Sequence, residues 1–161
     1  MGLLLPGYMP RGVVAITTDL NDTAYVGDTE TVVYQLPFTA APKRIYRVHF
    51  RVGRADTYSQ GDSSTRPAKS SMQVKCRWAA GSTVTTSGAL IGDYRVSVFN
   101  DSSDTATGVD ASFYLVNPPS GQLAVGISIY ANRASATYGT VRCLADTNAH
   151  LVVEDVGPYS E

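Results

Sequence analysis

The sequence has few of the residues on which catalytic and metal sites usually depend. Its 161 residues include two histidines, two cysteines and one tryptophan, and only 17% of them are charged. A net charge of −1 at pH 7 gives no electrostatic footprint for nucleic acid or for an acidic membrane. These scarcities favour a protein with no enzymatic activity and no cofactor, and they predict neither nucleic acid nor membrane as a partner.

Long hydrophobic runs are also missing. No stretch approaches the roughly 20 apolar residues that a membrane-spanning helix needs. Residues 1–6 contain three consecutive leucines and no basic residue, which is too little for a signal peptide. We therefore expect a chain that is made soluble and stays in the compartment where it is synthesised.

The cysteines are too few for a disulfide scaffold. Cys76 and Cys143 both fall at apolar positions of predicted strands, where thiols pack as small hydrophobes. Two buried free thiols are the expectation, and a bridge between them is the alternative that stays open.

Residues that favour strands are abundant. Serine and threonine make up 31 of the 161 residues, and both are poor in helix interiors because their side chains compete for backbone hydrogen bonds. Apolar and polar residues alternate along much of the chain, most clearly at residues 46–52 and 72–78. A period of two predicts half-buried strands, and the fold class is therefore expected to be all-β.

About ten short strands are predicted, separated by turn-forming Gly, Pro, Asn and Asp residues. One polar face on each strand indicates an antiparallel β-sandwich of two packed sheets, and a jelly-roll-like topology is the concrete prediction. The predicted strands are residues 13–17, 32–38, 46–52, 72–78, 82–87, 94–99, 111–116, 123–129, 137–144 and 151–156.

The start of the chain departs from this alternation. Residues 1–11 contain Pro6 and Pro10, and proline cannot donate to a strand ladder. We therefore expect an extended N-terminal arm at residues 1–11, followed by a single β-sandwich domain at residues 12–161.

A second exception is the long polar connection at residues 55–71. Connections of this length are uncommon in a compact domain and are usually functional or disordered. Its composition fits a mobile hairpin tip and a contact surface equally well. Its candidate exposed contacts are Tyr58, Arg66 and Lys69.

The nearest match to a catalytic motif is Gly-Asp-Ser at residues 61–63, which resembles the nucleophile block of GDSL-type esterases. Those enzymes place the serine at a strand-to-helix turn, with an Asp and a His three residues apart near the C-terminus. Here Ser63 lies in a Ser/Thr-rich connection, and Asp146 and His150 are four residues apart. We therefore predict no esterase site and no catalytic residue.

Metal ligation is not predicted either. His49 and His150 are the only histidines, and no His or Cys pair has ligand spacing. His49 alternates with Arg47 and Arg51, which indicates a solvated strand face. The acidic residues Asp101, Asp104 and Asp110 have oxygen ligands suited to Ca²⁺, but they are also ordinary turn residues, and turns are the favoured interpretation.

Ten tyrosines raise the question of a sugar-binding face, because tyrosine rings stack well and carry a polar hydroxyl. Tyr34, Tyr46 and Tyr94 fall at core positions of predicted strands and are interpreted as packing residues. Tyr58, Tyr130 and Tyr138 are the better candidates for an exposed or intersubunit role.

Two terminal motifs resemble those of a known family. Residues 10–15 (PRGVVA) and residues 150–158 (HLVVEDVGP) resemble the opening and closing sequences of the β-rich domains of minor tail proteins from phages of actinobacteria. The order between them is similar too, with a Thr-rich stretch, a strand ending at Phe38 and Thr39, and then residues 44–48 (RIYRV). The resemblance covers residues 10–158, and its two ends are its specific parts.

This resemblance implies a tail-associated β-sandwich, commonly trimeric, at the tail tip or on fibres. Its expected partners are other copies of itself and other virion proteins, with a host surface glycan as a further possibility. It would be made in the host cytoplasm and built into the virion. A carbohydrate-binding receptor module and a capsid decoration protein are the alternatives, the latter because the large N-terminal anchoring region of longer family members is missing here.

Residues near the two motifs are the candidate assembly contacts. Glu154 and Asp155 are adjacent, so in a strand they point to opposite faces, and we expect them to pair with Arg11 or Arg142. Apolar runs at residues 113–116 and 151–153 fit either an intersubunit surface or a strand enclosed within one chain. The candidate assembly contacts are Pro6, Tyr8, Pro10, Arg11, Glu154 and Asp155.

Overall fold

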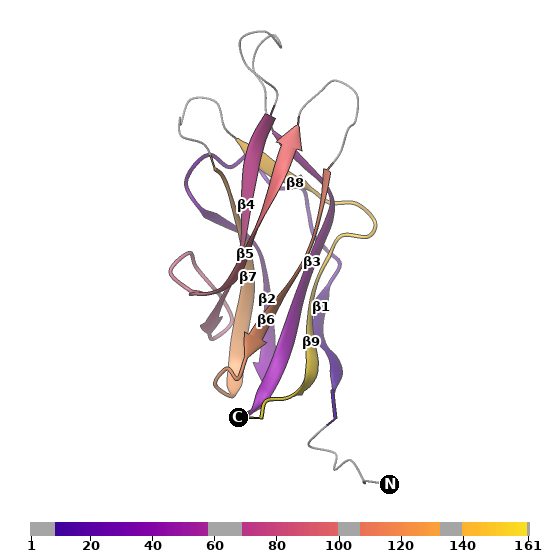
Figure 1. The fold of residues 1–161 in the computed structure, drawn as a ribbon, viewed down its shortest axis with the longest axis vertical. Helices are drawn as coiled ribbons and strands as arrows, with labels where there is room; N and C mark the ends of the chain where they lie inside the picture. Colours follow the sequence, from indigo (N-terminus) through magenta and orange to yellow (C-terminus); the bar gives the residue numbers. More distant parts are fainter. Residues whose placement is uncertain (1–8, 58–68, 100–106, 133–139, 161) are drawn as a thin grey trace.

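The computed structural model describes residues 9–57, 69–99, 107–132 and 140–160, and these form nine strands (Figure 1). The described residues contain no helix long and apolar enough to cross a membrane. The strands are β1 (Gly12–Thr17), β2 (Thr31–Ala40), β3 (Arg44–Thr57), β4 (Lys69–Ala80), β5 (Ala89–Phe99), β6 (Thr107–Val116), β7 (Gly121–Ala131), β8 (Val141–Leu144) and β9 (His150–Pro158).

The strands pair as a nested set. β4 pairs with β5, β3 with β6, β2 with β7 and β1 with β9, all antiparallel. The chain therefore folds back on itself as a two-stranded ribbon, and successive strand pairs of this ribbon lie alternately in the two sheets. Pairing of β9 with β3 completes sheet A, in the order β1-β9-β3-β6, and β8 also pairs with β3. Pairing of β7 with β4 completes sheet B, in the order β2-β7-β4-β5. This is a jelly roll, which confirms the predicted antiparallel sandwich.

The alternation of apolar and polar residues in the sequence corresponds to an alternation of buried and more exposed residues in the strands. In β3 and β9 every second residue is buried, because successive side chains of a strand point to opposite faces. The inward residues of both sheets form one hydrophobic cluster. Aromatic pairs join elements within it: Phe38 lies against Tyr46 with ring centres 5.1 Å apart, and Tyr34 against Phe50 at 5.6 Å.

One predicted strand is wrong. Residues 82–87 form a turn-containing loop between β4 and β5, which leaves nine strands in the described residues. Val84 in this loop is buried on the outer face of sheet B, where its side chain lies against Gly126 of β7, and its N–H donates to Gln35 Oε1 at 2.7 Å. The alternation of Thr and Val within residues 82–87 therefore belongs to a loop that packs on a sheet, and not to a strand.

The predicted 55–71 connection is also too long at both ends. β3 continues to Thr57 and β4 begins at Lys69, while Tyr58 and Arg66 lie outside the described residues, as does the motif at residues 61–63. β1 begins at Gly12, directly after the predicted arm, of which only residues 9–11 are described.

Most predictions for single core residues are confirmed. Cys76 and Cys143 are buried free thiols, and Tyr34 and Tyr46 are buried. Tyr94 is an exception: it pairs with the buried Val74 but is 42% exposed, because β5 is an edge strand and has no neighbour on one side.

Candidate assembly surface

Within the described residues, the strand orders β1-β9-β3-β6 and β2-β7-β4-β5 end in four edge strands, β1, β6, β2 and β5. These four differ in how they are protected against pairing with another chain. An uncovered edge is normally blocked by charge, proline or a bulge. β2 carries Pro37, β5 carries Asp93 and Arg95, and β6 carries Asp110. β1 contains no charged residue and no proline, and its one irregularity is a bulge between Val13 and Ala15.

β1 is also the most apolar exposed strand. Val13 is 57% exposed, Ile16 is 56% exposed and Val14 is exposed as well. Scattered exposed apolar residues are normal on a monomer, but here three of them lie within four residues of one edge strand. Such an edge is a template for strand addition or for packing against a second molecule.

The outer face of sheet A continues this apolar surface toward β6. Tyr114 and Val116 of β6 are about half exposed, at 56% and 50%, while their neighbours Phe113 and Leu115 point into the core. The outward residues of the two apolar runs noted in the sequence thus lie on one sheet face. Two adjacent rows cross the sheet, Val13–Glu154–Arg47–Tyr114 and Ile16–Val152–His49–Ser112. We call these eight residues the sheet A face.

The sheet A face carries an ion pair at its centre. Arg47 Nη2 donates to Glu154 Oε2 at 2.6 Å, and the two side chains are 42% and 30% exposed. Aromatic residues and Arg are enriched in protein interfaces, and charge at their centres is otherwise depleted. The sheet A face therefore combines apolar margins with one paired arginine.

The two terminal motifs meet at a buried ion pair at the end of sheet A. Arg44 Nε donates to Asp155 Oδ2 at 2.8 Å and Arg44 Nη2 to Asp155 Oδ1 at 2.5 Å, and both side chains are almost completely buried. Arg44 Nη2 also donates to the carbonyl of Met9, which ties the residues before β1 to β3. This bidentate bond to Asp155 raises the pKa of Arg44.

Gly157 completes this arrangement. Its N–H donates to Asp155 Oδ1 at 3.1 Å, and its φ of +144° lies in the region that favours glycine.

The predicted partners of the closing motif are partly correct. Glu154 and Asp155 do lie on opposite faces, one half-buried and one fully buried. Arg11 Nε lies 4.0 Å from Asp155 Oδ2 as expected, but the close partner of Asp155 is Arg44. Glu154 pairs with Arg47, because register places these two side by side on the outer face. The prediction that Arg142 pairs with this motif is wrong, since it donates to Asp56 at 2.9 Å.

The other candidate contacts lie outside the sheet A face or outside the described residues. Pro6 and Tyr8 lie outside the described residues, while Pro10 and Arg11 are exposed just before β1. Tyr138, Asp101 and Asp104 are also outside the described part. Tyr130 is half-buried and packs on the core.

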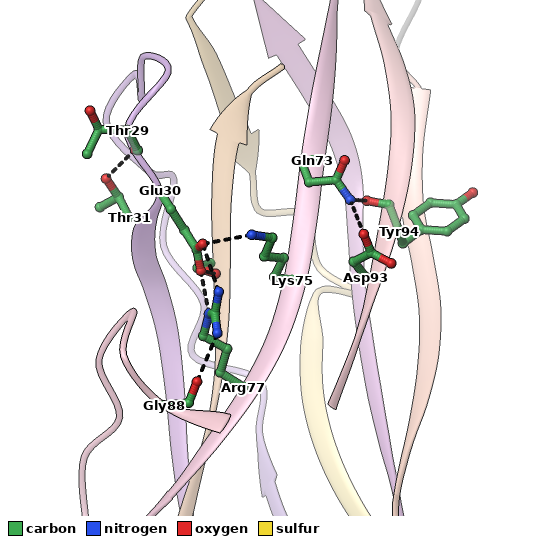
Figure 2. Close-up of polar contacts among 10 residues, drawn as sticks. Thr29, Glu30, Thr31, Gln73, Lys75, Arg77, Gly88, Asp93 and Tyr94 are labelled. Carbon is green, nitrogen blue, oxygen red and sulfur yellow. Dashed lines mark hydrogen bonds and ion pairs between the residues drawn. The ribbon is translucent and has the colours of Figure 1, made fainter. Parts of the chain in front are cut away.

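The outer face of sheet B has a different character, because its charges are locked together. Glu30, just before β2, accepts from Arg77 Nε at 2.5 Å, from Lys75 Nζ at 3.0 Å and from Ser128 Oγ at 2.6 Å (Figure 2). Arg77 also donates to the carbonyl of Gly88 in the loop between β4 and β5. The Arg77 hydrogen bond is the largest cause that lowers the pKa of Glu30 to about 2, and Ser128 and Lys75 add to it against the opposing effect of burial.

A second polar network lies beside it on β4 and β5. Gln73 Nε2 donates to Asp93 at 2.9 Å (Figure 2). Arg95 Nε donates to Gln73 Oε1 at 3.0 Å. With Val84 and its loop covering the adjacent part of sheet B, the central strand β7 is buried on both faces. Within the described strands, the exposed large hydrophobic residues of sheet B are Leu90 and Tyr94 on β5, fewer than the five on β1 and β6 of sheet A.

A polar hollow of about 400 Å³ lies between β1 and β2. Its lining includes Asp19, Asn21 and Asp22, together with Tyr34 as its aromatic residue. The Tyr34 ring is buried and its hydroxyl donates to the carbonyl of Asn21 at 2.8 Å, so it offers no exposed ring face on which a sugar could stack. Neither in this hollow nor in the rest of the described ranges are three His, Cys, Asp or Glu side chains grouped so as to hold a metal ion.

Comparison with known proteins gave one informative result. A family model described as "Domain of unknown function (DUF7298)" matches residues 1–161. No curated protein matches the chain.

Proposed function

We propose that this chain, which belongs to the DUF7298 family, is a non-enzymatic structural protein of a bacteriophage virion, a minor tail component at the tail tip or on a fibre. Its partners are other copies of the chain, with a trimer as the expected oligomer, and neighbouring virion proteins. It acts within the virion after assembly in the host cytoplasm.

The observation that carries this proposal is the uncovered edge of β1. The edge strands β2, β5 and β6 carry proline or charge, whereas β1 has exposed Val13 and Ile16 at one margin of the sheet A face. The half-exposed Tyr114 lies at the opposite margin. Burying such a surface is favourable by about 25 cal/mol per Å² of apolar area. A neighbouring copy that covers β1 would remove this edge from water.

The fold and the terminal motifs support the same function. Jelly rolls are common in viral capsid and lectin domains, although a fold by itself does not determine function. The residues of the PRGVVA and VEDVGP motifs are arranged around the Arg44–Asp155 pair, which fixes the direction in which the chain enters β1. The motif residues therefore position the strand proposed to make the contact.

The proposal is tested by the mass in solution of full-length variants. The untagged chain should have a mass that is a multiple of 17.2 kDa, three times for a trimer, over a range of concentrations in light scattering and sedimentation. Ile16→Lys should raise the dissociation constant at least ~10-fold, because a charge at the centre of an apolar contact is left without a partner. Unfolding should change little, since Ile16 is already 56% exposed.

Leu90→Lys is the matched control. Leu90 is 52% exposed on β5, an edge of the other sheet, so the same charge there should leave the mass unchanged. Equal dissociation by both variants would contradict the assignment of the contact to β1. A monomer at every concentration would contradict self-assembly and would favour the decoration alternative, in which other virion proteins supply the contacts.

A further inference from the structure

The two histidines of the chain lie together on the outer face of sheet A. His49 of β3 pairs with Val152 of β9, and the next outward position of β3, Arg51, pairs with His150, so the histidines are diagonal neighbours. Their ring centres are 4.9 Å apart, and His49 Nδ1 lies 3.2 Å from His150 Nε2. They are 101 residues apart in the sequence, which is why their spacing there indicates no site.

The outer nitrogen of each ring faces a group that can only accept a hydrogen bond. His49 Nε2 lies 2.8 Å from Asp110 Oδ1, and His150 Nδ1 lies 2.8 Å from the carbonyl oxygen of Asn148. A carboxylate and a backbone carbonyl have no proton to give, so each ring places its N–H on the outer side. When both rings are neutral, the two nitrogens that face one another, His49 Nδ1 and His150 Nε2, then both carry lone pairs.

Two lone pairs at this distance repel unless a cation lies between them. We infer that His49 and His150 form a binding site for a divalent transition-metal ion, with Asp110 and the Asn148 carbonyl as the outer partners that orient the rings. Histidine ligands of metals almost always donate their other N–H to a carboxylate or a backbone carbonyl, and both versions of that arrangement occur here.

The distances fit a shared ion. With metal–nitrogen bonds of about 2.0–2.1 Å, nitrogens 3.2 Å apart subtend an angle of about 100–106° at the metal, close to tetrahedral. The ring centres would then be about 5 Å apart, and they are 4.9 Å apart. A linear N–H···N bond of the same length would separate the centres by about 5.5 Å.

The site takes an ion that prefers imidazole, such as Zn²⁺, Cu²⁺ or Ni²⁺. Two protein ligands leave positions for water, so the site is weaker than a closed structural site with four. Arg51 is the nearby cation: its Nε lies 3.9 Å from Asp110 Oδ2 and its Nη1 donates to the Asn148 carbonyl at 3.4 Å. Asp110 offsets this charge. The inference does not depend on the proposed role in assembly.

The test is titration of the full-length, tag-free chain with CuCl₂ and ZnCl₂, followed by calorimetry and, for copper, by electron paramagnetic resonance. Wild type should bind one equivalent of Cu²⁺ with hyperfine structure from two nitrogens. His49→Gln and His150→Gln should each lower the affinity at least ~10-fold and remove one nitrogen, and Asp110→Asn should lower it ~10–100-fold, as loss of an outer partner does. Ser112→Ala, beside His49 on the same face, should bind like wild type.

Two results would overturn the inference. One is binding that persists unchanged in both His→Gln variants, which would place the metal elsewhere. The other is an absence of binding in wild type. ¹⁵N NMR spectra that show a single proton shared between His49 and His150 would then identify the cation between the rings as a proton.

Discussion

The two least exposed acidic side chains among the ion pairs of the described residues, Asp155 and Glu30, each accept several hydrogen bonds. Glu30 illustrates this arrangement, because its carboxylate is 17% exposed and accepts from two cations and a hydroxyl. Removing charges from water is costly, and geometry of this quality offsets that cost. The pKa of Glu30, lowered to about 2 from 4.5, measures how strongly the folded chain prefers the ionised form.

This preference predicts how stability depends on pH. Because the pKa of Glu30 is lower in the folded chain than in the unfolded chain, its contribution is complete above about pH 4.5 and is lost as the pH falls toward 2. Glu30→Gln should therefore lower the free energy of unfolding at pH 7 by on the order of 1–3 kcal/mol. Its deficit relative to wild type should shrink between pH 4.5 and pH 2 in urea unfolding experiments.

Glu154→Gln provides the control for this prediction. Glu154 also pairs with an arginine, but that pair is 42% and 30% exposed, and exposed pairs contribute about 0–1 kcal/mol. A deficit for Glu30→Gln that stays constant across this pH range would show that the ionised carboxylate is not the source of the stability.

For single residues, the sequence predicts the face of the strand on which a side chain lies better than it predicts the residues that the side chain contacts. Adjacency alone was enough to place Glu154 and Asp155 on opposite faces. Their partners depend on the register of β9 against β3, which pairs Glu154 with Arg47 across 107 residues of sequence. The meeting of His49 and His150 depends on the same register.

Among the elements, the loop between β4 and β5 packs on the outer face of a sheet although it contributes no strand to it. Val84 is buried against the outer face of sheet B, directly over Gly126, and Gln35 accepts its N–H. The close approach is possible because Gly126 has no side chain. A Cβ there would lie 2.2 Å from Val84 Cγ1.

Gly126→Ala should therefore displace the loop and lower the free energy of unfolding by about 1–3 kcal/mol, the usual cost of overpacking. Val84→Ala should partly rescue this loss, so that the double variant is more stable than the sum of the two single changes predicts. Thermal and urea unfolding measure both effects.

Gly27→Ala is the control for this pair, because a Cβ at Gly27 would meet nothing within 4 Å. It should change the free energy of unfolding by less than about 0.5 kcal/mol. A Gly126→Ala variant as stable as Gly27→Ala would contradict the packing of Val84 on sheet B.

Period-two alternation identified nine strands of the described chain, because burial on one face of a sheet imposes that period directly. It failed at residues 82–87, where one buried valine between threonines imitates a strand. The alternation also gave no indication that β1 is an edge strand. Residues 13–16 are as apolar as a core strand, and only the pairing order places them at the margin of sheet A.

For the molecule as a whole, the nested pairing makes each sheet combine strands from the N-terminal and the C-terminal halves of the chain. β1 pairs with β9, and β2 with β7, so strands distant in sequence complete both layers. Folds dominated by such non-local pairs form slowly, and neither sheet consists of one continuous segment. We therefore predict that residues 12–161 unfold as a single cooperative unit.

The two thiols test this prediction, because each reports on a different sheet. Cys76 lies in β4 of sheet B and Cys143 in β8 of sheet A, and both are fully buried. Burial raises the pKa of Cys76 and raises the pKa of Cys143 to about 12, so in the folded chain neither thiol should react with a disulfide reagent at pH 8. Labelling should be at least ~10³-fold slower than in the unfolded chain, in line with the small unfolded fraction of a stable domain.

Cys76→Ala and Cys143→Ala leave one reporter each. In urea at pH 8, the remaining thiol of either variant should become reactive at the midpoint at which the fluorescence of Trp78 in that same variant changes, because opening either sheet requires separation of strands shared with the common core. Reaction of Cys143 well below that midpoint would show that sheet A opens by itself. In that case the single-domain prediction would be wrong, and β1 with its apolar edge would belong to the less stable half of the molecule.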